Sequence, residues 1–84
     1  MWHIKRIVNY KGVSYYVSTA KLFYSSYIET MIFMCKRYVE TIEELSDDDI
    51  CWSDLYVERY SSFEDAERRH NEICNNIGKY VERK

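Results

Sequence analysis

The stretch that decides the fold is CWSDLYVERYSSFEDAERRHNEICNNIGKYV, residues 51–81. Its first part, 51–60, alternates with a two-residue period, and this predicts a β-strand. The alternation puts Trp52, Asp54, Tyr56, Glu58 and Tyr60 on one face of that strand. Leu55 and Val57 belong to the other face, and we expect them to point into the core.

The second part of this stretch changes to helical spacing after a pair of serines. Apolar residues then recur at intervals of three and four, which predicts a helix over about 62–77. The residues that form this stripe are Phe63, Ala66, His70, Ile73, Cys74 and Ile77. We expect Ser62 to cap the start of the helix and Gly78 to end it.

The first half of the chain reads as strands around turns. Alternation predicts strands at about 2–9 and 13–18, joined by a turn at Lys11 and Gly12. Residues 19–45 fit either a long helix or a strand by periodicity. The β-branched and aromatic content of 27–35 favours a strand there. A short acidic helix around 38–45 would then follow, within an acidic connection over 38–50.

Together these elements predict an α+β fold in one small domain. We expect an antiparallel β-meander of three to four strands packed against a C-terminal α-helix. The chain has 84 residues, of which 46% are hydrophobic and 17% aromatic, and no proline. This composition excludes a disordered tail or a proline-rich linker. Nine tyrosines suit half-buried positions, and we expect part of that surface to meet a partner.

Cysteine usage and hydropathy indicate a soluble cytoplasmic protein. The three cysteines, Cys35, Cys51 and Cys74, show no C-x-x-C spacing and follow no secretory leader, so we expect free thiols and no bound metal. The longest apolar run, 31–35, is far shorter than the ~20 residues needed to span a bilayer. We therefore expect no contact with a membrane.

The residues that catalysis requires are missing or unpaired. His70 and Cys74 are four apart on the predicted helix, where an imidazole could activate a thiol. Because that face is apolar, a core histidine beside a buried cysteine is the favoured interpretation. The two glycines, Gly12 and Gly78, form no phosphate-binding loop. The sequence predicts no enzymatic activity and no cofactor.

Charge is distributed unevenly along the chain, although the net charge is only −2. The interval 40–58 carries eight acidic residues and no basic one: Glu40, Glu43, Glu44, Asp47, Asp48, Asp49, Asp54 and Glu58. Such a run is typical of a solvated connection. It could also steer a partner, or mimic nucleic acid in a basic groove.

Several short patterns resemble small uncharacterised proteins encoded by phages and prophages. The patterns are Y-x-E-T-M-x-F, W-x-x-L and R-Y-S-S-x-E-D-A-x-x-x-H. The matching residues are Tyr27, Glu29, Thr30, Met31, Phe33, Trp52, Leu55, Arg59, Tyr60, Ser62, Glu64, Asp65, Ala66 and His70. Tyr27 departs from the expected spacing, because Ile28 is inserted before the Glu, and the segment 38–49 is longer than the short turn expected. The resemblance implies a β-meander closed by one helix and a phage or mobile-element origin; it supplies no active residues.

Two classes of binding function follow. The first is a phage-encoded inhibitor that docks on a host protein in the host cytoplasm, because aromatic and arginine side chains carry most interface energy. Its predicted contacts are Trp52, Tyr56, Arg59 and Tyr60, with Tyr15 or Tyr16 opposite and Asp47, Asp48 and Asp49 as the steering element.

The alternative class is an oligomeric protein that sequesters a small nucleotide. Tyrosine rings would stack on bases, while Lys5, Arg6, Lys36 or Arg37 would hold phosphates across a homo-oligomer interface. Direct nucleic-acid binding is disfavoured, because the basic residues are spread along the chain and form no run.

Overall fold

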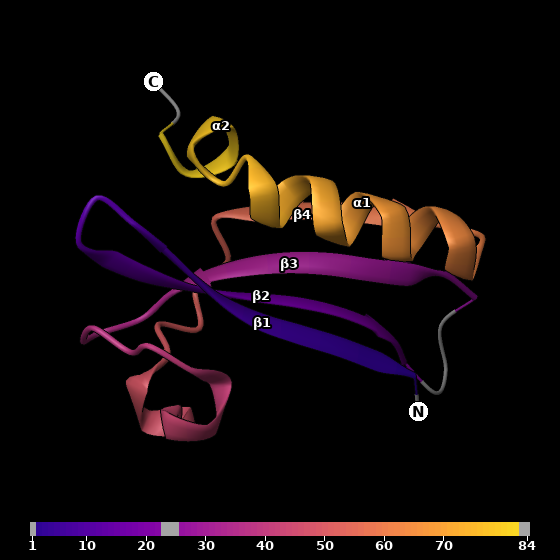
Figure 1. Ribbon diagram of the computed structural model, residues 1–84. Helices are drawn as coiled ribbons and strands as arrows, with labels where there is room; N and C mark the ends of the chain where they lie inside the picture. Colours follow the sequence, from indigo (N-terminus) through magenta and orange to yellow (C-terminus); the bar gives the residue numbers. More distant parts are fainter. Residues whose placement is uncertain (1, 23–25, 83–84) are drawn as a thin grey trace.

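The computed structural model describes residues 2–22 and 26–82 and shows a sheet covered on one face by a helix (Figure 1). The four antiparallel strands lie in the order β1-β2-β3-β4, so each pairs with its neighbour in sequence. This confirms the predicted α+β meander with a C-terminal helix. The strands are β1 His3–Tyr10, β2 Val13–Lys21, β3 Ile28–Met34 and β4 Tyr56–Tyr60; the helices are α1 Phe63–Asn75 and α2 Gly78–Val81. Two 3₁₀ turns, η1 Ile42–Glu44 and η2 Asp47–Asp49, lie between β3 and β4.

The hairpin of β1 and β2 is closed by a two-residue turn. Lys11 and Gly12 both have positive φ, 51° and 80°, as a type I′ turn requires. Because this turn matches the twist of the strands, the pairing continues from Tyr10↔Val13 to His3↔Ala20. Strand β2 therefore ends at Lys21, beyond the predicted 13–18.

The ambiguous segment 19–45 contains no α-helix among its described residues. Strand β3 occupies most of 27–35, as the β-branched content favoured. The acidic helix predicted around 38–45 is wrong: that stretch holds only the 3₁₀ turn η1, the turn η2 follows it, and much of the remaining connection is irregular.

Helix α1 begins as predicted but ends earlier. The Oγ atom of Ser62 accepts a hydrogen bond from the backbone N–H of Asp65 at 3.1 Å. The helix stops at Asn75, and Gly78 opens α2 instead of ending α1. Gly78 lets the Tyr10 ring approach closely, because a Cβ atom there would lie 2.6 Å from the hydroxyl of Tyr10 and the ring would have to move.

The core between the sheet and α1 combines an apolar cluster with a chain of hydroxyl groups. The buried cluster consists of Tyr15, Val17, Ile32, Ile73, Cys74 and Ile77. Beside it, His70 Nδ1 lies 2.8 Å from Thr19 Oγ1, which lies 2.6 Å from Thr30 Oγ1. The hydroxyl of Tyr60 donates to Thr30 Oγ1 at 3.1 Å. The three hydroxyl groups can therefore all donate in one direction, from Tyr60 through Thr30 and Thr19 to Nδ1 of a neutral His70.

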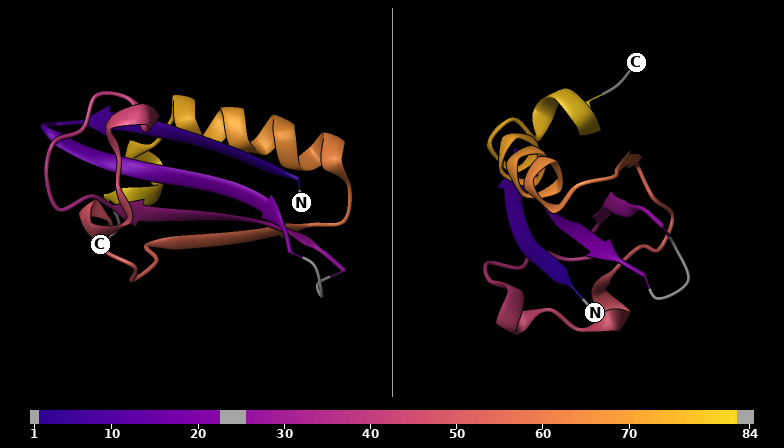
Figure 2. Two further views of the ribbon diagram at one scale, coloured as in Figure 1. Left: turned by 90° about the horizontal axis from the view of Figure 1, so that it is seen from below. Right: turned by 90° about the vertical axis from the view of Figure 1, so that its right-hand side faces the viewer.

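The opposite face of the sheet is covered at one end only. The connection between β3 and β4 folds beneath that end, as Figures 1 and 2 show. Its Ile50 is buried with Tyr16, Phe33 and Cys35, and Ile42 and Leu45 pack on this second core. The other end of the face carries no covering element in the described structure.

Strand β4 is shorter than predicted, and its faces are inverted. Cys35 bridges to Ile50, whereas Ile32 pairs with Tyr56. Between these two pairs the chain leading into β4 advances six residues, from 50 to 56, whereas β3 spans only three, from 35 to 32. The segment before β4 therefore carries three extra residues. An odd insertion reverses the alternation of side chains. Leu55 and Val57 are therefore 41% and 38% exposed, and the prediction that they face the core is wrong.

Candidate functional site

The uncovered part of the sheet carries a group of exposed apolar side chains, here called the Trp52 patch. Trp52 and Val57 are its exposed members, and Met31, which pairs with Val57, lies between Val57 and β2. A shallow hollow of about 100 Å³ continues the surface across β2 and β3. It is lined by Ser18, Ala20, Leu22, Glu29 and Met31. Exposed apolar side chains that gather on one surface are typical of an interaction site.

Trp52 is exposed, yet its ring is held in place. Its side chain is 57% exposed, the largest exposed fraction among the large hydrophobic residues described. The indole ring packs edge-on against Phe33 at 5.0 Å between centroids and against Tyr16 at 6.4 Å. Both tyrosine and phenylalanine are buried, so they form a fixed support for the indole.

Arg59 lies at the other end of the same face. Its Nε atom is 2.6 Å from Glu29 Oε2, and its guanidinium lies 5.1 Å from the ring centre of Tyr27. These contacts raise the pKa of Arg59, mainly through the hydrogen bond to Glu29. Arg59 therefore borders the Trp52 patch as an ordered cation.

The other predicted interface tyrosines are not exposed on this face. Tyr56 and Tyr60 are half-buried on the α1 side, because the inserted residues reverse β4. Tyr15 is buried in the core beneath α1, and Tyr16 is buried in the opposite core. Of the predicted aromatic and arginine contacts, Trp52 and Arg59 are exposed on this face, and Tyr16 lies buried beneath Trp52.

An ion pair between Arg69 and Glu58 lies on the α1 side of β4. Arg69 on α1 donates from Nε and Nη2 to the two carboxylate oxygens of Glu58, at 2.6 and 2.8 Å. This hydrogen bonding lowers the pKa of Glu58 to about 2. The ring of Tyr80 packs on Tyr56 at 4.9 Å, and its hydroxyl accepts from Arg69. These contacts join α1 and α2 to the edge of the sheet.

The predicted steering acids have different surroundings. Asp47 and Asp48 are exposed in η2. Asp49 instead accepts hydrogen bonds from Arg37 Nε and Nη2, at 2.9 and 3.0 Å. The Arg37 guanidinium is the main reason that the pKa of Asp49 is lowered. Two of the three acids thus remain on the surface, while the third holds the connection together.

The four basic residues proposed for phosphate binding do not form a cluster. Lys5 and Arg6 are neighbours in β1, so their side chains leave on opposite faces of the sheet. Lys36 and Arg37 follow β3, and Arg37 is paired with Asp49.

His70 and Cys74 occupy the core position that the sequence favoured. Both are buried, with Cys74 Sγ 3.8 Å from His70 Nε2. Burial raises the pKa of the Cys74 thiol and lowers the pKa of His70, so the neutral forms of both groups are favoured. The described residues contain no group of three His, Cys, Asp or Glu side chains placed to hold a metal. Among the described helices, none is long and apolar enough to cross a membrane.

Sequence reasoning missed Met31, Leu55 and Val57 as surface residues. The signal lay in the segment 51–55, where Ser53 and Asp54 interrupt the apolar residues. Comparison of the chain with protein-family models, with curated proteins and with solved structures finds no match. The assignment of function therefore depends on the chemistry of the surfaces themselves.

Proposed function

We propose that this chain is a small non-enzymatic binding protein that inhibits a host protein through the Trp52 patch. The observation that carries the proposal is the geometry of Trp52, which is 57% exposed while two buried aromatic side chains support its ring. Tryptophan is among the residues enriched in interface hot spots. Since the ring is already fixed, little side-chain entropy is lost when a partner covers it.

The charges around the patch indicate the chemistry of the partner. Exposed acids in η2, Asp47 and Asp48, belong to the connection that carries Trp52, and the interval 40–58 contains no basic residue. A partner with an apolar pocket and a basic rim would be attracted to this arrangement. The resemblance to phage-encoded proteins supports a bacterial host protein as the target. The same acidic surface supports nucleic-acid mimicry as a weaker alternative.

Replacing Trp52 by Ala tests the proposal. We expect tagged Trp52→Ala protein to lose the partner that the wild-type protein retains from bacterial lysate, while circular dichroism shows an unchanged fold. The matched control is Tyr38→Ala, because Tyr38 is also an exposed aromatic residue, at 52%, but lies beside Met34 and Gly12. The proposal fails if both variants retain the partner, or if Trp52→Ala unfolds the chain.

The alternative, nucleotide sequestration by an oligomer, makes a different prediction. It requires Lys5, Arg6, Lys36 or Arg37 from several copies to gather around a phosphate. Substituting Lys36 by Glu would then release a bound nucleotide, whereas the inhibitor proposal expects this variant to retain its protein partner.

A further inference from the structure

Strand β1 forms one edge of the sheet and presents backbone groups outward. It is the first strand in the order β1-β2-β3-β4, and no described element pairs with its outer side. The backbone N–H of Lys21 donates to the carbonyl of Trp2 at 3.0 Å, which fixes the alternation of the ladder. Even-numbered residues of β1 therefore exchange hydrogen bonds with β2. The N–H and C=O groups of His3, Lys5, Ile7 and Asn9 point away from the sheet.

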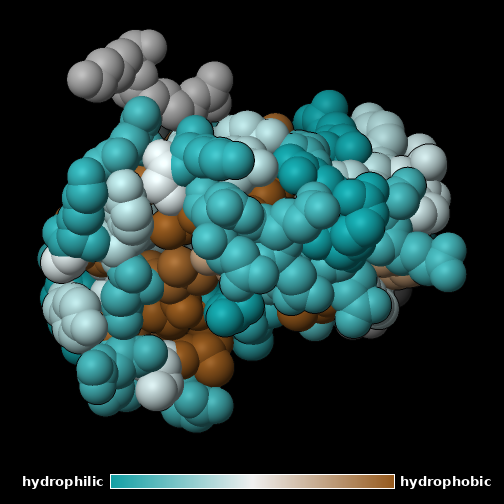
Figure 3. Space-filling model, turned by 45° about the horizontal axis from the view of Figure 1, so that its top comes forward, coloured by the Kyte–Doolittle hydropathy of each residue, from teal (hydrophilic) through white to brown (hydrophobic). Residues whose placement is uncertain are grey.

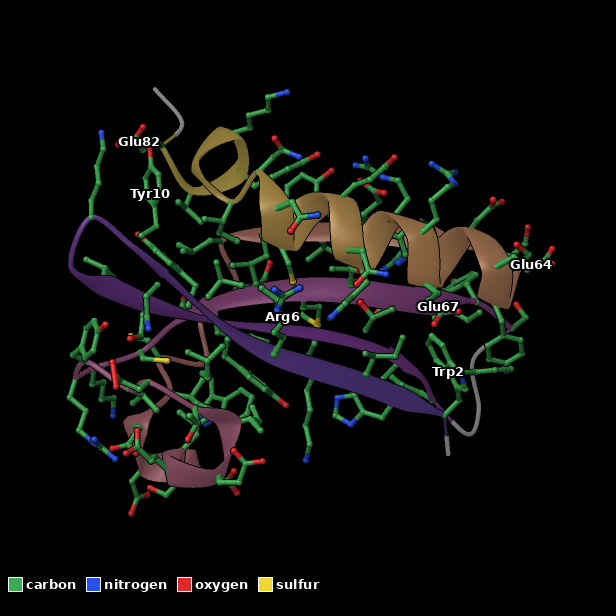
Figure 4. The ribbon with its side chains drawn as sticks, viewed as in Figure 1. Trp2, Arg6, Tyr10, Glu64, Glu67 and Glu82 are labelled. Atoms are coloured by element: carbon green, nitrogen blue, oxygen red, sulfur yellow. The ribbon has the colours of Figure 1, made fainter. Side chains whose placement is uncertain are left out.

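A groove lies between this strand and the helices. It has a volume of about 560 Å³ and is bordered by Val8 and Tyr10 on one side and by Cys74, Ile77 and Gly78 on the other. Figure 3 shows hydrophobic surface in the hollow between the hairpin and the helical layer. Figure 4 shows Arg6 reaching from β1 toward α1, with Tyr10 near the end of the hairpin. An edge strand beside a helix, with a groove between them, can accept an extended peptide.

The charge of β1 indicates which peptide fits. The strand contains Lys5 and Arg6, both exposed, and no acidic residue. A second copy of the chain would place another Lys5 and Arg6 alongside, and lysine on an edge strand opposes such self-pairing. An acidic segment would be attracted to the same edge.

We propose that β1 accepts an extended segment of a partner protein as an additional antiparallel strand, with acidic side chains beside Lys5 and apolar side chains in the groove toward Ile77. In this pairing, residues opposite Lys5, Ile7 and Asn9 share their face of the sheet and donate to their outward carbonyls. Residues opposite Val8 and Tyr10 lie on the α1 side, above the groove. The groove part of this site lies on the α1 side of the sheet, opposite to the face of Trp52, and the proposal is independent of the proposed function.

The probe is a capped peptide of alternating Glu and Val, as long as β1. The ¹⁵N-labelled full chain is titrated with it, and amide hydrogen exchange is followed by NMR. We expect the amides of Lys5, Ile7 and Asn9 to become protected, while those of Arg6 and Val8 are protected already. Trp52→Ala protein should bind the peptide equally well.

Two matched peptides test the geometry of strand addition. Methylation of the Glu backbone nitrogens removes the donors that face β1, and we expect affinity to fall by about tenfold or more. Methylation of the Val nitrogens leaves those donors intact, so this peptide should bind like the parent. On the protein side, Lys5→Glu should abolish binding, whereas Lys36→Glu, a charge reversal after β3, should not.

Three results would overturn the proposal. One is that millimolar peptide leaves the amides of Lys5, Ile7 and Asn9 unprotected. Another is that both methylated peptides bind equally, because contact would then be electrostatic without a ladder. The third is that these amides are protected without peptide and that the protein has twice the mass of a monomer. A second copy of the chain would then occupy the edge.

Discussion

Helix α1 lies along one face of the sheet, whereas the connection between β3 and β4 covers only one end of the other. The first cover is a regular amphipathic element whose buried side chains, such as Ala66 and Ile73, follow its helical period. The second is an irregular segment held by particular contacts, among them Arg37 with Asp49 and Ser14 with the backbone of Val39. Both produce a buried core.

The difference explains where this small protein keeps surface for binding. A helix buries a continuous stripe, so it leaves few apolar groups exposed beneath it. An irregular connection buries the residues that it reaches and no others. The Trp52 patch lies where that cover ends, and substitutions on the two faces should therefore have unequal effects on stability and binding.

The largest expected effect is a cavity beneath α1. Ile73 is fully buried between the helix and the sheet, and we expect Ile73→Ala to lower the free energy of unfolding by about 3–4 kcal/mol. Ile50→Ala, in the opposite core, should cost about 2 kcal/mol, because the irregular connection can collapse into the space. Urea denaturation of both variants measures this contrast. Equal losses would show that the two covers are equally rigid.

A smaller effect is expected from the ion pairs on the two faces. Arg69→Met breaks the two hydrogen bonds to Glu58, and we expect a loss of about 1–2 kcal/mol. Arg59→Met, on the open face, removes a pair with Glu29 in which the arginine side chain is 59% exposed, so stability should change less. Arg69 is the more buried arginine and also bonds to Glu72 and Tyr80, and thermal denaturation compares the two variants directly.

The pair of Glu58 and Arg69 also predicts a pH dependence. The pKa of Glu58 is lowered to about 2 in the folded protein, below its ordinary value of 4.5. The folded state therefore binds this proton less readily than the unfolded state, so the stabilisation is present above pH 4.5 and is lost as pH falls toward 2. The free energies of unfolding of wild-type and Arg69→Met protein should therefore approach each other as the pH falls from 4.5 toward 2. A difference in the free energy of unfolding that stays constant over this range would contradict the role given to the Glu58–Arg69 pair.

A milder dependence on pH is expected from His70. Burial lowers its pKa below the ordinary value of 6.5, so only the unfolded state takes up a proton just below that pH. Stability should fall as pH drops below 6.5, by at most about 1.4 kcal/mol per pH unit. His70→Gln removes the titratable imidazole, so the free energy of unfolding should depend less on pH. His3→Gln is the matched control, because the pKa of His3 is also lowered but His3 is exposed, whereas His70 is buried, so most of the slope should survive in it.

The regular parts of the fold could be predicted from sequence, because each has a repeating pattern that burial enforces. The spacing of Ala66, His70 and Ile73 identified α1, and the serine at 62 identified its start. The inversion of β4 could not be predicted, because it depends on pairing between Cys35 and Ile50, which are far apart in sequence. For the same reason the alternation in the sequence places Tyr56 and Tyr60 on the face of Trp52, whereas in the structure they lie on the α1 side.

The measurement that tests the central claim most directly is native mass spectrometry of wild-type and Trp52→Ala protein, each purified gently from bacterial lysate. The subunit count and any retained mass are read together. We predict that the wild-type chain carries a host protein in fixed stoichiometry and that the variant, still folded, carries none. The contrary result is a homo-oligomer in both samples that retains roughly a few hundred daltons per subunit, the mass of a small nucleotide. That outcome would contradict the role of the Trp52 patch and favour nucleotide sequestration.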